Sequence, residues 1–162
     1  MIVESFNEDE FASRVVRLAF EQDVTSEGLV QDAEIVVAGG RGLGSAKDFA
    51  EVFEVARRLG GAVGASRAVV DQGWASYAHQ IGLSGKSVTP RLYMALGISG
   101  SPNHLAGMSS SDVIVAVNKD PEANIFKVAD FGIVGDLAEI IPALLERLDR
   151  LNAVPPKESP PE

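Results

Sequence analysis

An unbroken apolar run, AEIVVAGG at residues 33–40, gives the clearest pattern in the chain and ends in two glycines. Such a run predicts a strand covered on both faces, as in a parallel sheet. After the turn GGRGLG, apolar residues recur at helical spacing through residues 49–59. Ser45 can cap that helix, with Asp48 three residues later, and Gly60 is a natural end. The segment therefore predicts a strand, a glycine turn and a helix.

The same pattern recurs along the chain in looser form. A short helix is predicted to begin at Arg67, and a closing helix at residues 136–151 carries one apolar stripe that Pro142 is expected to bend. Further strands are predicted within residues 61–66, 91–99, 112–120 and 126–135. This alternation predicts an α/β fold, an open parallel sheet with helices on both faces, of the Rossmann-like nucleotide-binding type. Ligands of such folds bind outside the carboxyl ends of the strands.

The two ends of the chain differ from its middle. Residues 1–30 are expected to form a lead-in segment, in which Asn7 with Glu10 favours a helix while RVVRLAF favours a strand. Residues 31–151 are expected to form the binding domain. The tail at 152–162 is rich in proline and polar residues, which predicts disorder.

Composition narrows the possible functions. The chain has 162 residues, of which 46% are hydrophobic, enough for one core, and it has no cysteine, which excludes disulfides and thiolate chemistry. The first residues are acidic and no apolar run is long enough to span a bilayer, so we expect no membrane insertion and a cytoplasmic location, or the mitochondrial matrix in a eukaryote. The net charge of −9 argues against nucleic-acid binding. Residues 35–119 nevertheless hold eight bases and five acids, so a small anion can bind there.

Cationic and hydroxyl side chains follow five successive predicted strands. They are Arg41, Ser66 with Arg67, Ser84, then Ser99, Asn103 and His104, and finally Asn118 with Lys119. Each feature alone also fits an ordinary surface turn, and GGRGLG matches G-x-G-x-x-G only in part. The backbone amides of this glycine turn are still expected to approach a phosphate closely, because no side chains block them. His79 has no visible partner and is interpreted as structural. Together the five groups favour a long anionic ligand such as a dinucleotide.

Four stretches carry a family likeness: VVAGGRGLGS, VGASRAVVDQGW, GLSGKSVTPRLYMALGISGSPNHLAGM and IVAVNKDPEANIFKVADFGIVGDL. In this order and spacing the chain resembles the C-terminal, FAD-binding domain of the electron transfer flavoprotein alpha subunit, from about Ala33 to Leu148. The resemblance implies FAD as the cofactor. RVVRLAF resembles the strand that leads into this domain, which favours a strand there.

The resemblance assigns five residues to the flavin and its diphosphate. Arg41 would lie along the diphosphate or the flavin edge, and Ser66 near the diphosphate. Arg67 would lie against the isoalloxazine ring, where a cation stabilises the charge gained on reduction. Ser84 would bond flavin N5 in place of the usual threonine. His104 would donate to the C2 carbonyl oxygen. Two buried cations at the ring would raise its reduction potential.

A second group of residues would hold the rest of the cofactor. Ser99 and Asn103 would flank the diphosphate or ribityl chain. Asn118, Lys119 and Asp130 would hold the ADP end. In such a site the protein binds and tunes the cofactor, and no acid–base or nucleophilic group is required.

The chain departs from the family at three points. Leu83 replaces a common glutamine, SPN at residues 101–103 replaces a more typical Ala-Ile-Gln, and only about 30 residues precede the matching region.

The expected function is an electron carrier rather than an enzyme. It would receive electrons from acyl-CoA or other dehydrogenases, pair with an electron transfer flavoprotein beta subunit and pass electrons to a quinone oxidoreductase. A nucleotide-binding or assembly module without redox activity is the alternative. An NAD-dependent deacylase ranks last, because the zinc cysteines of those enzymes are absent.

Overall fold

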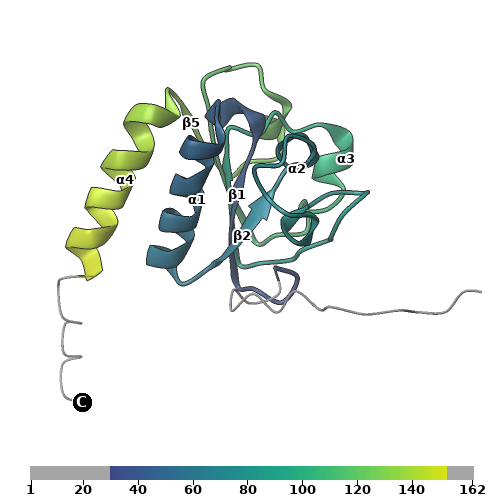
Figure 1. The fold of residues 1–162 in the computed structure, drawn as a ribbon, viewed down its shortest axis with the longest axis horizontal. Coiled ribbons are helices and arrows are strands. Elements are labelled where there is room, and N and C mark those ends of the chain that lie inside the picture. Colours follow the sequence, from purple (N-terminus) through teal and green to yellow (C-terminus); the bar gives the residue numbers. More distant parts are fainter. Residues whose placement is uncertain (1–29, 153–162) are drawn as a thin grey trace, which may run out of the picture.

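A computed structural model describes residues 30–152, and the two predictions for residues 1–29 and the predicted tail beyond residue 152 lie outside this range. Its strands form one parallel sheet in the order β2-β1-β3-β4-β5 (Figure 1). The strands are β1 (Ile35–Gly39), β2 (Ala62–Ala65), β3 (Leu92–Leu96), β4 (Val113–Asn118) and β5 (Phe131–Val134). The helices are α1 (Ala46–Leu59), α2 (Arg67–Asp71), α3 (Pro102–Leu105) and α4 (Leu137–Asn152). Short 3-10 turns are η2 (Arg41–Leu43), η3 (Tyr77–His79) and η4 (Asn124–Lys127).

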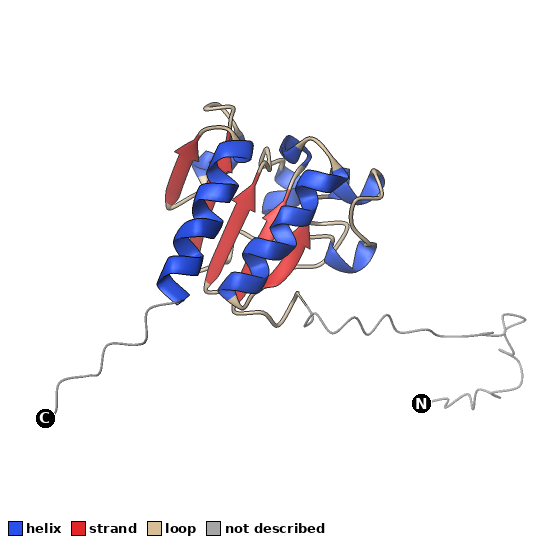
Figure 2. Ribbon diagram, turned by 60° about the vertical axis from the view of Figure 1, so that its left-hand side comes forward, coloured by secondary structure: helices blue, strands red, loops and turns tan. Residues whose placement is uncertain are grey.

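The predicted α/β fold with an open parallel sheet is confirmed, and its two faces are covered unequally. The long helices α1 and α4 lie side by side on one face (Figure 2), where Val37 and Met94 pack against Phe49 and Ile141. Short elements cover the opposite face, where Ile125 of η4 packs in one cluster with Tyr93. This second layer is made largely of turns, so it can shape a recess that two regular helices would fill.

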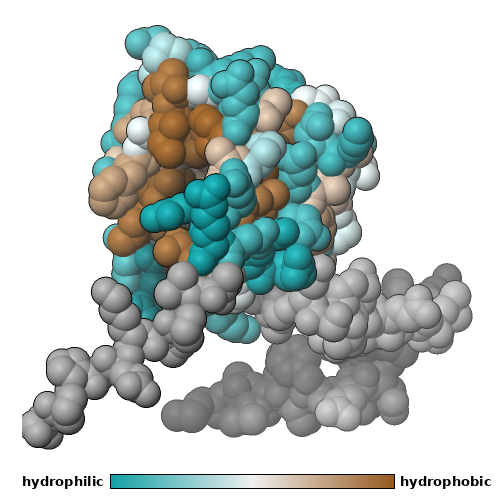
Figure 3. All heavy atoms as spheres, turned by 90° about the vertical axis from the view of Figure 1, so that its left-hand side faces the viewer, coloured by the Kyte–Doolittle hydropathy of each residue, from teal (hydrophilic) through white to brown (hydrophobic). Residues whose placement is uncertain are grey.

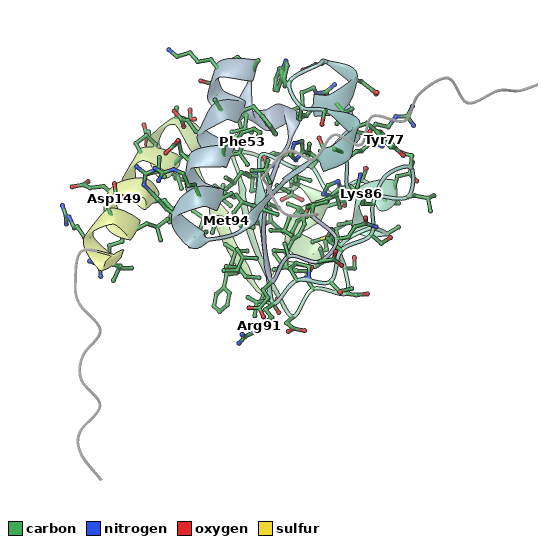
Figure 4. The ribbon with its side chains drawn as sticks, turned by 60° about the horizontal axis from the view of Figure 1, so that its bottom comes forward. Phe53, Tyr77, Lys86, Arg91, Met94 and Asp149 are labelled. Atoms are coloured by element: carbon green, nitrogen blue, oxygen red, sulfur yellow. The ribbon has the colours of Figure 1, made fainter. Side chains whose placement is uncertain are left out.

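The ends of α1 follow the sequence prediction. Ser45 Oγ accepts a hydrogen bond from the backbone N–H of Asp48 at 3.2 Å, and Gly60 ends the helix with a φ of +67°. Arg58 of α1 donates from Nε to the Asp149 carboxylate of α4 at 2.6 Å, and Figure 4 shows Asp149 on α4. The two helices are thus joined at their exposed ends as well as through the core.

One detail of the C-terminal prediction needs correction. Of the predicted strand at 126–135 only β5 is a strand, because the residues before it belong to η4 and its following turn. Pro142 lies inside α4, which runs from Leu137 to Asn152. The apolar stripe of α4 packs on the sheet as predicted, with Leu137 and Ile141 buried.

The edge strand β5 leaves apolar side chains at the surface. Phe131, Ile133 and Val134 are 64%, 46% and 58% exposed. The α4 side of the molecule, seen in Figure 3, carries a broad apolar area beside polar residues. Among the described residues β5 pairs with β4 alone, and exposed apolar surface on such an edge is typical of a surface that contacts another polypeptide. None of the helices between residues 30 and 152 is long and apolar enough to cross a membrane.

Candidate functional site

A cleft of about 560 Å³ opens at the carboxyl ends of β1, β2, β3 and β4. Its walls come from the turn after β1, the start of α2, the loop at residues 81–84, the segment 97–104 and the turn after β4. A hollow of about 200 Å³ adjoins it and shares Gly42, Gly97, Asn118 and Lys119 with it. The position is where parallel sheets bind ligands, and the volume is that of a typical ligand pocket.

The cleft brings together nine of the ten residues predicted for the site. They are Arg41, Ser66, Arg67, Ser84, Ser99, Asn103, His104, Asn118 and Lys119. The carboxyl ends of adjacent parallel strands meet at one edge of the sheet, so residues spread over 79 positions of sequence line one recess.

The structure does not bring Asp130 to this cleft. Asp130 precedes β5, and its carboxylate accepts the backbone N–H of Ile114 at 2.8 Å, at the amino end of the sheet. The resemblance assigned Asp130 to the ADP end, whereas the structure places Asp130 before β5 and not after it. Asp136 lies instead at the carboxyl edge and lines the adjoining hollow with Asn118 and Lys119. Its position after β5, directly before the apolar stripe of α4, is a sequence signal that would have found it.

The glycine turn after β1 does a different task from the predicted one. The Gly40 and Gly42 amides donate to Leu96 O at 2.8 Å and Gly97 O at 3.0 Å, so these amides are not free to hold a phosphate. A Cβ added at Gly40 would lie 2.2 Å from Gly97 O. The glycines therefore let the turn pack against the end of β3, and Arg41 remains at the surface of the cleft.

The lining of the cleft is positively charged. Among the described residues, the lining includes three cations, Arg41, Arg67 and Lys119, and one carboxylate, Asp120. The prediction of buried cations is wrong, because both arginines stand on the rim, where no element of the described chain covers them. The Arg67 side chain is 67% exposed and lies 3.4 Å from the Asp71 carboxylate, an exposed pair that constrains it weakly.

Ser84 is held by two neighbours behind it. The Tyr77 hydroxyl and the Gln80 Nε2 each donate to Ser84 O at 2.9 Å, and Gln80 Nε2 also donates to Ser84 Oγ at 3.1 Å. A carbonyl oxygen can only accept, so the amide nitrogen of Gln80 must face Ser84, and Oγ accepts as well. The Ser84 hydroxyl proton is left to donate elsewhere. Lys86 Nζ lies over the Tyr77 ring, 5.4 Å from its centroid, and Figure 4 shows the two side by side.

His104 is buried in the wall of the cleft. Its Nε2 lies 2.9 Å from the hydroxyl of Tyr93, and its Nδ1 is buried without a hydrogen-bond partner of good geometry in residues 30–152. Burial lowers the pKa of His104 to about 4, and the nearby backbone of Ile81 opposes this shift more weakly. The ring is therefore neutral near pH 7.

Asn118 also has a structural task at the end of β4. Its Nδ2 donates to Ile98 O at 2.9 Å, and its Oδ1 accepts the Asp120 N–H at 3.0 Å. The side chain thus ties together the two turns that form one wall of the cleft. One amide hydrogen of Asn118 remains for a ligand.

Comparison with known proteins assigns the chain to a family. Residues 29–109 match the model of the electron transfer flavoprotein FAD-binding domain. This chain belongs to that family. It is 50% identical over 147 residues to the electron transfer flavoprotein subunit alpha of Thermoanaerobacterium thermosaccharolyticum, covering 90% of this chain and 44% of that protein. It is also 57% identical over 129 residues to the electron transfer flavoprotein subunit alpha of Bacillus subtilis, and this match covers 79% of this chain and 40% of that protein.

A third relative carries the word mitochondrial in its name. The protein named electron transfer flavoprotein subunit alpha, mitochondrial, of Arabidopsis thaliana is 56% identical over 116 residues, which cover 72% of this chain and 32% of that protein. The chain spans less than half the length of each of these three relatives.

The residues of the cleft fit the FAD that gives the domain family its name. A phosphate-bearing ligand needs cations, and three line the cleft. A polar ring needs oriented donors, and Ser84 and His104 supply two groups fixed from behind. Within residues 30–152, His104 Nδ1 is the one buried side-chain nitrogen or oxygen without a hydrogen-bond partner of good geometry, and it belongs to a residue that lines the cleft.

Proposed function

We propose that this chain binds FAD in the cleft and is the flavin-holding part of an electron carrier. The observation that carries the proposal is the convergence of nine polar or charged side chains on one cationic recess, eight at or after the ends of four strands and Ser84 from the loop at residues 81–84, in a member of the electron transfer flavoprotein FAD-binding domain family. When bound, the flavin accepts and releases electrons. The protein's own residues bind it, orient it and offset its charge.

The charges and donors of the cleft support separate tasks for its residues. Arg67 and Arg41 are permanent cations, and a cation beside a ring that gains negative charge favours its reduced state. Ser84 and His104 would donate hydrogen bonds to acceptor atoms of the ring. Lys119 and the adjoining hollow, with Asn118 and Asp136, would hold the ADP end. Asp130 has no part in this assignment.

We further propose that the chain works in assembly with other polypeptides. The relatives carry the name subunit alpha and are more than twice as long as their match to this chain. The exposed apolar edge at β5 is a suitable contact surface for an electron transfer flavoprotein beta subunit. Acyl-CoA or other dehydrogenases would donate electrons, and a quinone oxidoreductase would accept them, in the cytoplasm or the mitochondrial matrix.

Titration of the purified chain with FAD tests the proposal. We expect visible flavin absorption bands to remain after gel filtration, and a reduction potential above that of free FAD. Arg67→Ala should lower both the affinity and the potential. Arg147→Ala, on the exposed side of α4 away from the cleft, removes the same charge and is the matched control.

Two results would count against the electron carrier. Absence of retained flavin bands would contradict FAD binding by this chain. Retained FAD with a potential equal to that of free FAD, unchanged by Arg67→Ala, would favour a binding or assembly module without redox activity.

A further inference from the structure

Tyr93, the second residue of β3, lies behind the wall of the cleft. It is fully buried in the core, and its ring is 6.3 Å from that of His104. Its hydroxyl oxygen and His104 Nε2 are 2.9 Å apart. Tyr93 does not line the cleft. A polar atom in such an apolar cluster needs a reason, because burial of a hydroxyl without a hydrogen bond costs about 1–3 kcal/mol.

The direction of this hydrogen bond follows from the available partners. Within residues 30–152 the Tyr93 hydroxyl has no other hydrogen-bond partner than Nε2. Its single proton is satisfied only if Nε2 carries a lone pair. The opposite direction would leave the hydroxyl proton unpaired and would place a lone pair of Nδ1 in the wall near the Ile81 backbone, whose influence on His104 favours a protonated ring.

We propose that Tyr93 is a positioning residue for the cofactor site, which holds His104 as the Nδ1–H tautomer and so makes the wall of the cleft a neutral hydrogen-bond donor. The proposal rests on the proposed function in one respect, that the ligand presents an acceptor atom there. Burial raises the pKa of Tyr93 and keeps its hydroxyl protonated, which is consistent with the donor role.

The fixed tautomer matters for recognition. A neutral imidazole has one donor and one acceptor nitrogen, and the free ring can exchange them. Without Tyr93 the wall would present a donor or a lone pair, and a lone pair repels a carbonyl oxygen. Because Tyr93 holds one tautomer before the ligand arrives, this repulsion does not occur. A ring acceptor that gains negative charge then meets an oriented N–H group.

Nitrogen NMR of the chain without cofactor tests this inference directly. The sequence has two histidines, so ¹⁵N-histidine labelling gives two rings, and His79→Gln assigns them. We expect His104 at pH 7 to show a protonated Nδ1 and an unprotonated Nε2. We expect Tyr93→Phe to give a mixture of tautomers and to weaken FAD binding about 2- to 10-fold, the value of one hydrogen bond. Tyr77→Phe is the matched control for the tautomer, since the sequence has two tyrosines.

The outcomes separate the inference from the proposed function. A protonated Nε2 in the wild-type protein, or an unchanged Nδ1–H tautomer in folded Tyr93→Phe, would overturn the inference whatever the protein does with FAD. Failure of the wild type to bind FAD would overturn the proposed function and leave the tautomer result standing. If Tyr93→Phe does not fold, 3-fluorotyrosine in the Tyr77→Phe background keeps the packing and makes the hydroxyl a stronger donor. The His104 Nε2 resonance should then shift, and an unmoved resonance contradicts the inference.

Discussion

Acid should destabilise this fold through one buried histidine. His104 has a pKa of about 4 in the folded protein, against an ordinary value of 6.5, because burial disfavours its charged form. Below pH 6.5 the unfolded chain takes up a proton that the folded chain refuses. The stability contributed by the neutral ring is therefore complete above pH 6.5 and is lost as the pH falls toward 4.

The size of this effect follows from the shift. Each pKa unit corresponds to about 1.4 kcal/mol, so the folded state should lose about 3 kcal/mol between pH 6.5 and 4 through this one group. No carboxylate or cation among the described residues hydrogen-bonds to the ring, and its ring partner is Tyr93. Loss of solvation is thus the main cause, and salt should change the effect little.

Urea unfolding between pH 4.5 and 8 measures the loss. His104→Gln removes the titrating ring, and the difference in pH slope between this variant and the wild type isolates its share from that of the acids. His79→Gln, the matched control, removes the half-buried second histidine, whose Nδ1 lies 2.9 Å from Val63 O. Equal pH slopes for wild type and His104→Gln would refute the reasoning. If His104→Gln does not fold, the proton NMR titration of wild-type His104 decides, and a midpoint near 6.5 would contradict burial of a neutral ring.

Three further changes probe the packing, the cleft and the surface. Gly40→Ala places a Cβ against Gly97 O and should cost about 2 kcal/mol or more of unfolding free energy in urea titrations, and a loss below about 0.5 kcal/mol would show that the turn relaxes. Gln80→Met removes the donor to Ser84, so FAD affinity measured by flavin fluorescence should fall about 2- to 10-fold, and equal affinity would deny Gln80 a positioning role. Ile133→Lys should leave FAD binding intact and abolish co-purification with a beta subunit, and undiminished co-purification would exclude β5 as the contact surface.

The fold could be predicted because its signals are local. The ends of α1 depend on Ser45 and Gly60, two residues whose capping geometry needs only their immediate neighbours. The convergence of Arg41, Ser66 and His104 could also be predicted, since the carboxyl ends of parallel strands share one edge. Neither inference required knowledge of which side chains touch.

The errors arose where contacts between distant residues decide. The amides of Gly40 and Gly42 look free in the sequence, and only the approach of Gly97 shows that they are used. Asp130 and Asp136 flank a four-residue strand and therefore lie at opposite ends of the sheet, a difference that the assignment of Asp130 by family resemblance did not show. Tyr93 stands in an apolar run and gives no sign of its hydroxyl partner.

Two hydrogen bonds behind the cleft wall, from Gln80 to Ser84 and from Tyr93 to His104, leave both cleft groups as hydrogen-bond donors. Gln80 makes Ser84 Oγ an acceptor from behind and leaves its proton for the cleft, and Tyr93 does the same for His104 by occupying Nε2. Both groups could otherwise accept as easily as donate. With Arg67 on the rim, each fixed group then favours a ligand atom that carries negative charge. A site with this polarity holds a reduced, electron-rich ring more tightly than an oxidised one, and that difference in affinity raises the reduction potential of the bound cofactor.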